Sequence, residues 1–184
     1  MKRAWDIMLL VSVAITLSTS EAKSFPYSLE PLFSVGWGQL MLQRIGHPVP
    51  EGILDNLSFG GGRIEEGGKV AGEFRREGSG RIVMRTDGVG IIDVRATLET
   101  TDGALISVTY HGRVDLGVDG YQRYLKDGFP PQDTIPLPMA VHFHTTHPNY
   151  LWLNRLQGLG VGLIEPARSV IAYDVYAVRS KHTP

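Results

Sequence analysis

Short runs that alternate between apolar and polar residues recur along most of this chain, separated by turns rich in glycine and proline. In the run GVGIIDVRATLETTDG, residues 88–103, every second residue from Ile92 to Leu98 is apolar, and the positions between them include Asp93 and Arg95. A period of two is typical of a β-strand with one buried face. No long stripe with the period of a helix accompanies these runs, so the pattern predicts an all-β protein.

Eight segments carry this pattern and are predicted to be strands: Pro31–Trp37, Lys69–Phe74, Arg81–Arg85, Val89–Glu99, Ala104–Gly112, Met139–Thr145, Tyr150–Leu153 and Val170–Val178. The tripeptide Thr-Asp-Gly occurs twice, at residues 86–88 and 101–103, each time between alternating runs. Asp-Gly favours tight hairpin turns because both residues tolerate a positive φ. Residues 81–112 are therefore expected to form a three-stranded meander.

Two segments are expected to be long loops. Residues 46–68 mix prolines, glycines and charges, and residues 115–138 contain four prolines near their end, which argue against a central strand. Within the second segment, DGYQRYLKDG is expected to form one or two helical turns. The glycines of residues 158–162 are interpreted as a flexible turn. Together these features predict a single antiparallel β-barrel of about eight strands, similar to the calycin and lipocalin barrels, with the long loops near its mouths.

The N-terminus has the features of a secretory signal. Lys2 and Arg3 precede an apolar run of 11 residues, Ile7–Leu17, which is shorter than the roughly 20 residues that a spanning helix needs. Small residues near Ala22 fit cleavage after that residue. We expect residues 1–22 to be a signal peptide and the mature protein to be secreted or periplasmic, without a membrane contact of its own. The alternative is an uncleaved N-terminal anchor.

Composition excludes several functions. The 184-residue chain has a net charge of −1 and no basic stripe, so no nucleic-acid partner is expected. It contains no cysteine, which rules out disulfides, thiolate metal sites and thiol nucleophiles. Asn56 begins an Asn-Leu-Ser glycosylation sequon, which would place that segment on the surface if the source is a eukaryote.

The histidines are candidate metal ligands. His142 and His144 share one face of a predicted strand, and His111 and His147 lie on or near others. No carboxylate follows at a short spacing to complete a ligand set, so surface or pocket-wall histidines are the favoured interpretation. The glycine-rich segments also lack the spacing of phosphate-binding or dinucleotide-binding loops. No metal and no cofactor are therefore expected.

Other residues suggest a binding pocket without defining one. Asp174 lies in the apolar strand IAYDVYAV, where a carboxylate is costly unless paired. It is either a structural partner of Arg95 or a general acid. Tyr150, Trp152 and Asn154 share one face of a predicted strand, either as a ligand wall or as an aromatic core face.

Three blocks resemble, in order and spacing, the Domain of Unknown Function 3237 family: GGGRIEEGGKVAGEF, RTDGVGIIDVRATLETTDGALISV and FHTTHPNYLWLNRLQGLGVG. The resemblance covers roughly residues 29–179 and implies a single barrel domain with an internal cavity. The chemistry associated with the family is cofactor-free cyclisation, in which a phenol oxygen adds across an alkene to give a cyclic ether. Two departures stand out: Ile64 occupies a position that is commonly Phe in the family, and His144 one that is often a carboxylate.

The resemblance suggests roles for particular side chains. If Asp93 and Arg95 point inward, Arg95 could bind a phenolate and Asp93 could orient it or accept the phenol proton. Asp174 or a protonated His144 could supply the acid that an alkene needs. The candidate catalytic residues are thus Asp93, Arg95, His144 and Asp174, and the candidate substrate-binding residues are Phe143, Tyr150, Trp152, Asn154 and His111.

Three functions remain open. The chain could be a cofactor-independent cyclase, isomerase or hydratase acting on a small apolar or phenolic compound, a lipocalin-like binding protein without turnover, or a surface protein with a filled core. A cavity that contains desolvated acids favours the enzyme, and a purely apolar cavity favours the binding protein. The orientation of Asp93 and Arg95 and the oligomeric state are not set by the sequence.

Overall fold

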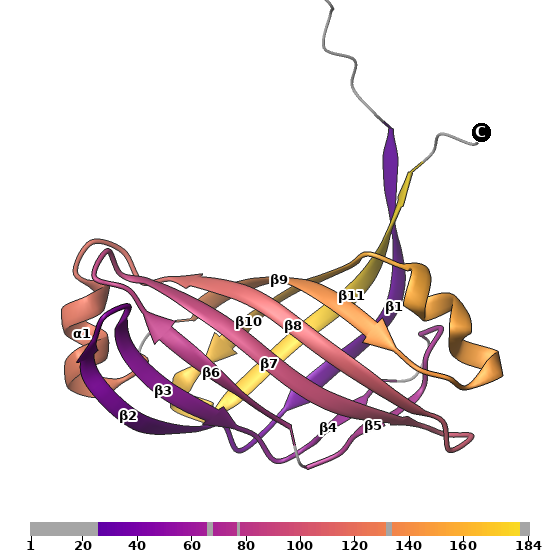
Figure 1. Cartoon of the computed structure of the whole chain (residues 1–184), viewed down its shortest axis with the longest axis horizontal. Coiled ribbons are helices and arrows are strands. Elements are labelled where there is room, and N and C mark those ends of the chain that lie inside the picture. The colour runs from indigo at the N-terminus through magenta and orange to yellow at the C-terminus, as the bar shows by residue number, and fades with distance from the viewer. Residues whose placement is uncertain (1–25, 66–67, 77, 132–133, 181–184) are drawn as a thin grey trace, which may run out of the picture.

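The computed structural model describes residues 26–65, 68–76, 78–131 and 134–180 (Figure 1). In this part of the chain the strands are β1 (Tyr27–Trp37), β2 (Met41–Val49), β3 (Gly52–Ser58), β4 (Gly62–Ile64), β5 (Gly72–Phe74), β6 (Ser79–Met84), β7 (Val89–Thr100), β8 (Leu105–Asp115), β9 (Ile135–His144), β10 (Gly158–Glu165) and β11 (Val170–Ser180). The helices are α1 (Gly120–Asp127) and two 3₁₀ segments, η1 (Pro148–Arg155) and η2 (Pro166–Arg168). None of these helices is long and apolar enough to span a membrane.

The strands form one antiparallel sheet that closes on itself. Its order runs β7–β5–β4–β1–β11–β10–β9–β8, and β8 pairs again with β7, which completes an eight-stranded barrel. β6 pairs with the same edge of β7 as β5 does, over Gly90–Arg95 rather than Leu98–Thr100. β3 and β2 continue outward from β6. The predicted all-β barrel is confirmed, with extra strands beyond the closed ring.

Alternation along each strand decides what the barrel contains. On β7, Ile92, Ala96 and Leu98 are buried, whereas Asp93 is half-buried and Arg95 is exposed. The inward side chains of the other strands are likewise aliphatic or aromatic. Each fully buried large apolar side chain contributes about 1.5–3 kcal/mol relative to exposure, so this core is the main source of stability.

The two Thr-Asp-Gly turns form the predicted meander. Gly88 and Gly103 have φ values of 84° and 83°, which is the left-handed region that glycine adopts without strain. β6, β7 and β8 follow one another in the sheet around these turns, as the sequence predicts.

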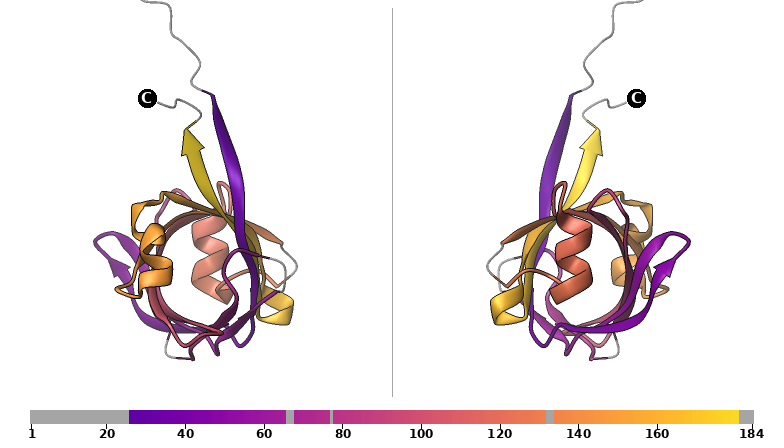
Figure 2. Two further views of the ribbon diagram at one scale, coloured as in Figure 1. Left: turned by 90° about the vertical axis from the view of Figure 1, so that its right-hand side faces the viewer. Right: turned by 90° about the vertical axis from the view of Figure 1, so that its left-hand side faces the viewer.

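Helix α1 lies across one mouth of the barrel (Figure 2). Its position agrees with the short helix expected in DGYQRYLKDG, and Gly128, whose φ is 72°, follows its last residue. At the opposite end, the first residues of β1 and the last residues of β11 pair with each other and extend beyond the barrel (Figure 1), with Tyr27 opposite Ser180.

Several predicted boundaries are wrong. The expected loop of residues 46–68 contains β3, β4 and the end of β2, and the expected turn of residues 158–162 lies within β10. In β10, glycine permits close packing, because a Cβ at Gly158 or Gly160 would contact the side chains of Val141 and Met139. Strand-forming contacts across the barrel therefore outweigh the turn preference of glycine.

The prolines of β9 and the segment around Trp152 are also corrected. Pro136 and Pro138 lie in β9, within the segment expected to be a loop. They are tolerated because β9 pairs with β8 only from Met139 onward, so both prolines lie where that edge has no partner strand. The predicted strand Tyr150–Leu153 is instead part of η1, which begins at Pro148. The expected signal peptide, residues 1–22, lies outside the described residues.

Candidate functional site

A narrow cavity lies inside the barrel. It has about 40 Å³ of room, which is enough for a few water molecules or a small ligand group. Its walls are aromatic and aliphatic and come from β1, β3, β7, β8, β9, β10 and β11 and from the segments that follow β1, β3 and α1. The lining residues are Trp37, Leu40, Leu57, Phe59, Ile92, Val94, Tyr110, Phe129, Leu137, Met139, Ile164, Ile171 and Tyr173.

Three of these side chains bring polar atoms into the apolar interior. The indole Nε1 of Trp37 donates a 2.7 Å hydrogen bond to the hydroxyl of Tyr173. The ring of Tyr110 packs edge-on against that of Tyr173, with 5.4 Å between ring centroids. The Tyr110 hydroxyl is buried and makes no hydrogen bond of good geometry among the residues that the structure describes. The neighbouring Tyr173 hydroxyl affects its pKa as a hydrogen-bond acceptor does, but it already accepts from Trp37, so the Tyr110 donor is poorly satisfied, which is costly.

Burial also determines the charge state of the two tyrosine hydroxyls in the cavity wall. It raises the pKa of the Tyr110 hydroxyl well above its ordinary value, and the neighbouring Tyr173 adds to this shift. Burial raises the pKa of Tyr173 in the same direction. Both phenols are therefore neutral across the physiological range and act as hydrogen-bond donors or acceptors, not as ions. No Asp, Glu, His, Lys or Arg is among the lining residues.

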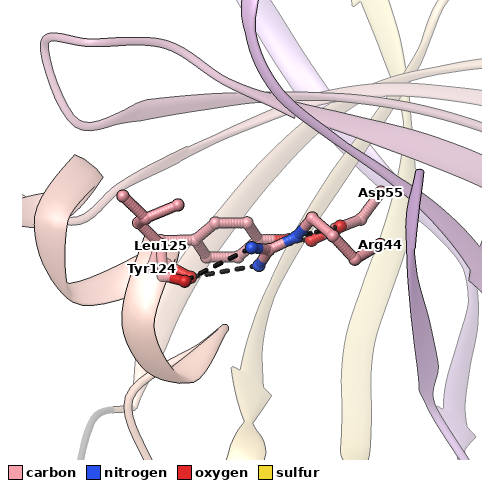
Figure 3. A network of polar contacts seen from close by, with 4 residues as sticks. All are labelled: Arg44, Asp55, Tyr124 and Leu125. Atoms are coloured by element: carbon pink, nitrogen blue, oxygen red, sulfur yellow. Dashed lines mark hydrogen bonds and ion pairs between the residues drawn. The ribbon is translucent and has the colours of Figure 1, made fainter. Parts of the chain in front are cut away.

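A polar network fixes α1 across the mouth of the barrel (Figure 3). Asp55, on β3, is almost completely buried and accepts two hydrogen bonds from opposite sides. The Tyr124 hydroxyl of α1 donates to its Oδ2 at 2.7 Å, and Nε of Arg44 on β2 donates to its Oδ1 at 2.5 Å. Pairing with a cation and a hydroxyl is what makes a buried carboxylate tolerable here.

Arg44 extends this network to the end of the helix. Its two terminal nitrogens donate to the backbone carbonyls of Tyr124 and Leu125, at 3.2 and 3.3 Å. These carbonyls lie in the last turn of α1, where a cation is favourable. Tyr124 also packs edge-on against Phe129, which lines the cavity, with 5.3 Å between ring centroids. The network therefore holds both α1 and one cavity wall in place.

Sequence analysis did not identify Asp55, Arg44 and Tyr124 as site residues. A signal was present, because Ile53, Asp55 and Leu57 alternate onto one face of a strand, which puts a carboxylate on an apolar face. It was obscured because this segment was interpreted as a loop. Tyr110 and Tyr173 lie on predicted strands, but only closure of the barrel brings their rings together.

Asp93 and Arg95 lie on the outer face of β7, and the hypothesis that they point into the barrel is wrong. The inward positions of this strand are the apolar residues that alternate with them. Asp93 lies 3.9 Å from Nδ1 of His111 on β8, and Arg95 is exposed. Neither side chain reaches the interior cavity.

The other two candidate catalytic residues are also outside. His144 is exposed near the end of β9, on the face opposite Phe143. Asp174 is exposed on β11, where it accepts hydrogen bonds from the hydroxyls of Ser34 at 2.6 Å and Tyr176 at 3.2 Å. Asp174 is therefore paired on the surface, and its partner is not Arg95.

The candidate substrate-binding residues are distributed elsewhere. Phe143 is buried in the core beside Phe33, with 6.3 Å between ring centroids, but it does not line the cavity. His111 is on the outer face. Within the described residues, no three His, Cys, Asp or Glu side chains are grouped to hold a metal ion.

The residues of η1 make local contacts instead of a ligand wall. The Tyr150 hydroxyl donates a 2.9 Å hydrogen bond to Asp102, and Trp152 donates through its indole to the carbonyl of Asn149. Asn154 both donates to the carbonyl of Thr145 and accepts from its backbone N–H, at 2.8 and 2.9 Å. These contacts fasten η1 to the end of β9 and to the β7–β8 turn.

The two predicted modification sites have different outcomes. Asn56 is exposed on β3, which leaves its side chain accessible. Ala22, the expected cleavage site, lies outside the described residues.

Fold and cavity together define a small closed β-barrel with an aromatic, uncharged cavity. The chain belongs to the DUF3237 family of proteins of unknown function, whose family model matches residues 27–178. No curated protein matches this chain.

Solved structures share the fold. A β-barrel-like protein from Acinetobacter baumannii is 24% identical with a TM-score of 0.70, and the match covers 86% of this chain and 100% of that one. A protein of unknown function from Rhodopseudomonas palustris is 22% identical with a TM-score of 0.69, over 84% and 99% of the two chains. An enzyme from Penicillium herquei is 20% identical with a TM-score of 0.57, over 85% and 99%. At these identities the likeness concerns the fold alone.

Proposed function

We propose that this protein binds a small, largely apolar or aromatic molecule inside the barrel, as a lipocalin-like carrier without turnover. The observation that supports this function most directly is the buried hydroxyl of Tyr110, a residue that lines the apolar cavity, because this hydroxyl makes no hydrogen bond of good geometry in the described part of the chain. A ligand oxygen that accepts from this hydroxyl would remove the cost of leaving it unpaired.

The cavity also constrains the ligand. Its walls are apolar apart from the phenols and the indole, so the body of the ligand must be apolar and uncharged. Its volume of about 40 Å³ is small, so a molecule with a full ring requires movement of the side chains around it.

Binding can be tested with two probes of similar shape, acetophenone and ethylbenzene, of which only acetophenone carries an acceptor oxygen. Wild-type protein should bind acetophenone about tenfold more tightly, as expected for one buried hydrogen bond. Tyr110→Phe should remove this difference and leave ethylbenzene binding unchanged. Calorimetric titration measures both affinities. The exposed Tyr27, changed to Phe, is the matched control.

Two results would contradict the proposal. One is that neither probe binds at millimolar concentration. The other is that Tyr110→Phe and wild-type protein prefer acetophenone equally, which would place the acceptor contact elsewhere.

Turnover is the second candidate function, and two observations favour it: the Penicillium herquei enzyme shares this fold, and Tyr110 offers a proton donor inside the cavity. The reaction would be a cofactor-free cyclisation of a phenol onto an alkene. It ranks below binding because burial raises the pKa of Tyr110, which makes it a weak acid for protonating an alkene. Incubation with 2-allylphenol tests it: a cyclic isomer of unchanged mass supports an enzyme, and unchanged phenol supports a carrier.

We further propose that the protein is exported. The support is the signal-like N-terminus that ends near Ala22. N-terminal sequencing of the protein recovered from outside the cytoplasm should begin at Lys23. Recovery of the intact N-terminus in the cytoplasmic fraction would contradict export.

A further inference from the structure

The outer face of the barrel carries an arrangement of charges that the interior cavity does not use. Three exposed arginines lie on neighbouring strands around Asp93: Arg81 on β6, Arg95 on β7 and Arg113 on β8. We call these three residues the outer arginine cluster. Arg81 is directly opposite Asp93 in the β6–β7 register. Arg95 is two residues further along β7, on the same face.

The cluster is not neutralised by its surroundings. In the described part of the chain, Arg81, Arg95 and Arg113 take part in no ion pair, whereas Arg85 pairs with Asp87. Asp93 itself lies 3.9 Å from His111, directly opposite it on β8. Asp93 therefore lies among three guanidinium groups and an imidazole, and Glu51 is a second carboxylate that lines the same surface. Arg81 and Arg95 are diagonal neighbours across the β6–β7 pair, and positive charge exceeds negative charge here, so this arrangement favours an added anion.

The outer surface is concave around the outer arginine cluster. One hollow of about 630 Å³ is open to solvent and is lined by Arg81, Asp93 and Arg95 together with hydroxyl and amide side chains, which are Gln43, Asn56, Ser58 and Ser79. A second hollow, of about 950 Å³, adjoins it. Its charged or titratable lining residues are Glu51, Arg81, Arg85, Asp93, His111 and Arg113, and most of its other lining residues are apolar, for example Val83, Ile91 and Leu159. Arg81 and Asp93 line both hollows and mark the place where they meet.

We propose that this face binds a small hydroxylated molecule that carries two or more phosphate or sulfate groups. Guanidinium groups match such oxyanions in geometry and keep their charge, and the nearby serines and amides can hydrogen-bond the remaining oxygens. Arg95 and Arg113 lie in different hollows with Arg81 between them, which suits a ligand with separated anionic groups. A concave surface fits a discrete molecule better than the flat surface of a lipid bilayer.

Inorganic tripolyphosphate is a suitable probe, and its affinity is measured by calorimetric titration at low and at physiological salt. Arg81→Gln and Arg95→Gln should each weaken binding about tenfold, as expected for loss of a charge-assisted contact. Arg155→Gln, which removes an exposed arginine of η1 that lines neither hollow, should change the affinity less than twofold. Because these side chains are exposed, the variants should keep the wild-type melting temperature, which circular dichroism checks.

Asp93→Asn provides a gain-of-function test. Removing the central carboxylate leaves the cluster without its own counter-charge, so tripolyphosphate should bind at least about threefold more tightly. A non-specific attraction of the anion to any exposed arginine would show equal losses for Arg95→Gln and Arg155→Gln, and that result overturns the proposal. Undetectable binding at low salt also overturns it.

Vesicles separate a soluble ligand from a lipid headgroup. In a co-sedimentation assay, the protein should not pellet with vesicles that contain phosphatidylserine in phosphatidylcholine. If the protein binds these vesicles through Arg81 and Arg95 but does not bind tripolyphosphate, the partner is a membrane surface and the proposal fails. This test is independent of the interior cavity, because none of the substituted residues lines it.

Discussion

The hydroxyl of Tyr124 donates a 2.7 Å hydrogen bond to Oδ2 of Asp55, and this contact joins the helix across the barrel mouth to the barrel wall. The two residues are 69 positions apart in the sequence. Asp55 is almost completely buried, so its carboxylate depends on Tyr124 and Arg44 for compensation. The closed end of the cavity is therefore held by polar contacts, while its interior is held by apolar ones.

Tyr124→Phe should lower the free energy of unfolding by about 2 kcal/mol, because a buried carboxylate oxygen loses its partner. Asp55→Ala should cost more, about 3 kcal/mol, since it leaves both Tyr124 and Arg44 unpaired. Urea denaturation followed by circular dichroism measures both changes. Tyr27→Phe, at an exposed position, should have almost no effect. Equal stability of Tyr124→Phe and wild-type protein would show that the contact is not energetically important.

Tyr110→Phe and Tyr173→Phe should change stability in opposite directions. The Tyr110 hydroxyl makes no hydrogen bond of good geometry in the described residues, so its removal should stabilise the ligand-free protein by about 1 kcal/mol. The Tyr173 hydroxyl accepts from Trp37, so its removal should destabilise by about 1–2 kcal/mol. Thermal unfolding compares the two variants under identical conditions. Destabilisation by Tyr110→Phe would indicate that its hydroxyl is already satisfied, for example by bound water.

Gly162→Ala should destabilise the barrel by about 3 kcal/mol. A Cβ at this position would lie 2.2 Å from both the carbonyl oxygen of Ala172 and the Cβ of Tyr173, so the β10–β11 pair must shift. Gly36→Ala is the matched control, because a Cβ there has no atom within 4 Å. It should change the unfolding free energy by less than about 0.5 kcal/mol. Similar effects at the two positions, measured by urea denaturation, would contradict the close approach.

Asp102 should contribute to the stability of the fold in a pH-dependent way. Hydrogen bonds from the hydroxyls of Thr100 and then Tyr150 hold the pKa of its carboxyl below the ordinary value. Because the folded pKa is depressed, the stabilisation is fully present above the unfolded pKa of roughly 3.9 and is lost as the pH falls through the folded pKa. Asp102→Asn should therefore be less stable than wild-type protein at pH 7.

The difference between wild type and Asp102→Asn should shrink as the pH is lowered below about 4. Denaturation curves at pH 7, 5, 4 and 3 measure it. Asp127→Asn is the control, since its carboxylate is exposed and its Oδ2 lies 3.9 Å from Nζ of Lys126, too far for a hydrogen bond. A difference that stays constant down to pH 3 would show that the charge of Asp102 does not contribute.

The fold class followed from local pattern. Alternation in residues 88–103 and the two Thr-Asp-Gly turns act over a few residues, and both could be recognised without knowledge of distant contacts. The strands that were not predicted, β2, β3, β4 and β10, contain glycines or polar residues whose own preferences do not favour a strand. Their pairing with neighbours decides their conformation, as at Gly158 opposite Val141.

The chain by itself determined that Asp93 and Arg95 share one face of a strand, because alternation fixes the relative orientation of residues two apart. Which face points inward was decided by the tertiary structure, since closing the barrel buries the apolar set and leaves the charges outside. The cavity was likewise set by closure, which brings Trp37, Tyr110 and Tyr173 together from three strands. Contacts between residues so far apart in sequence depend on the path of the whole chain, and no local preference encodes them.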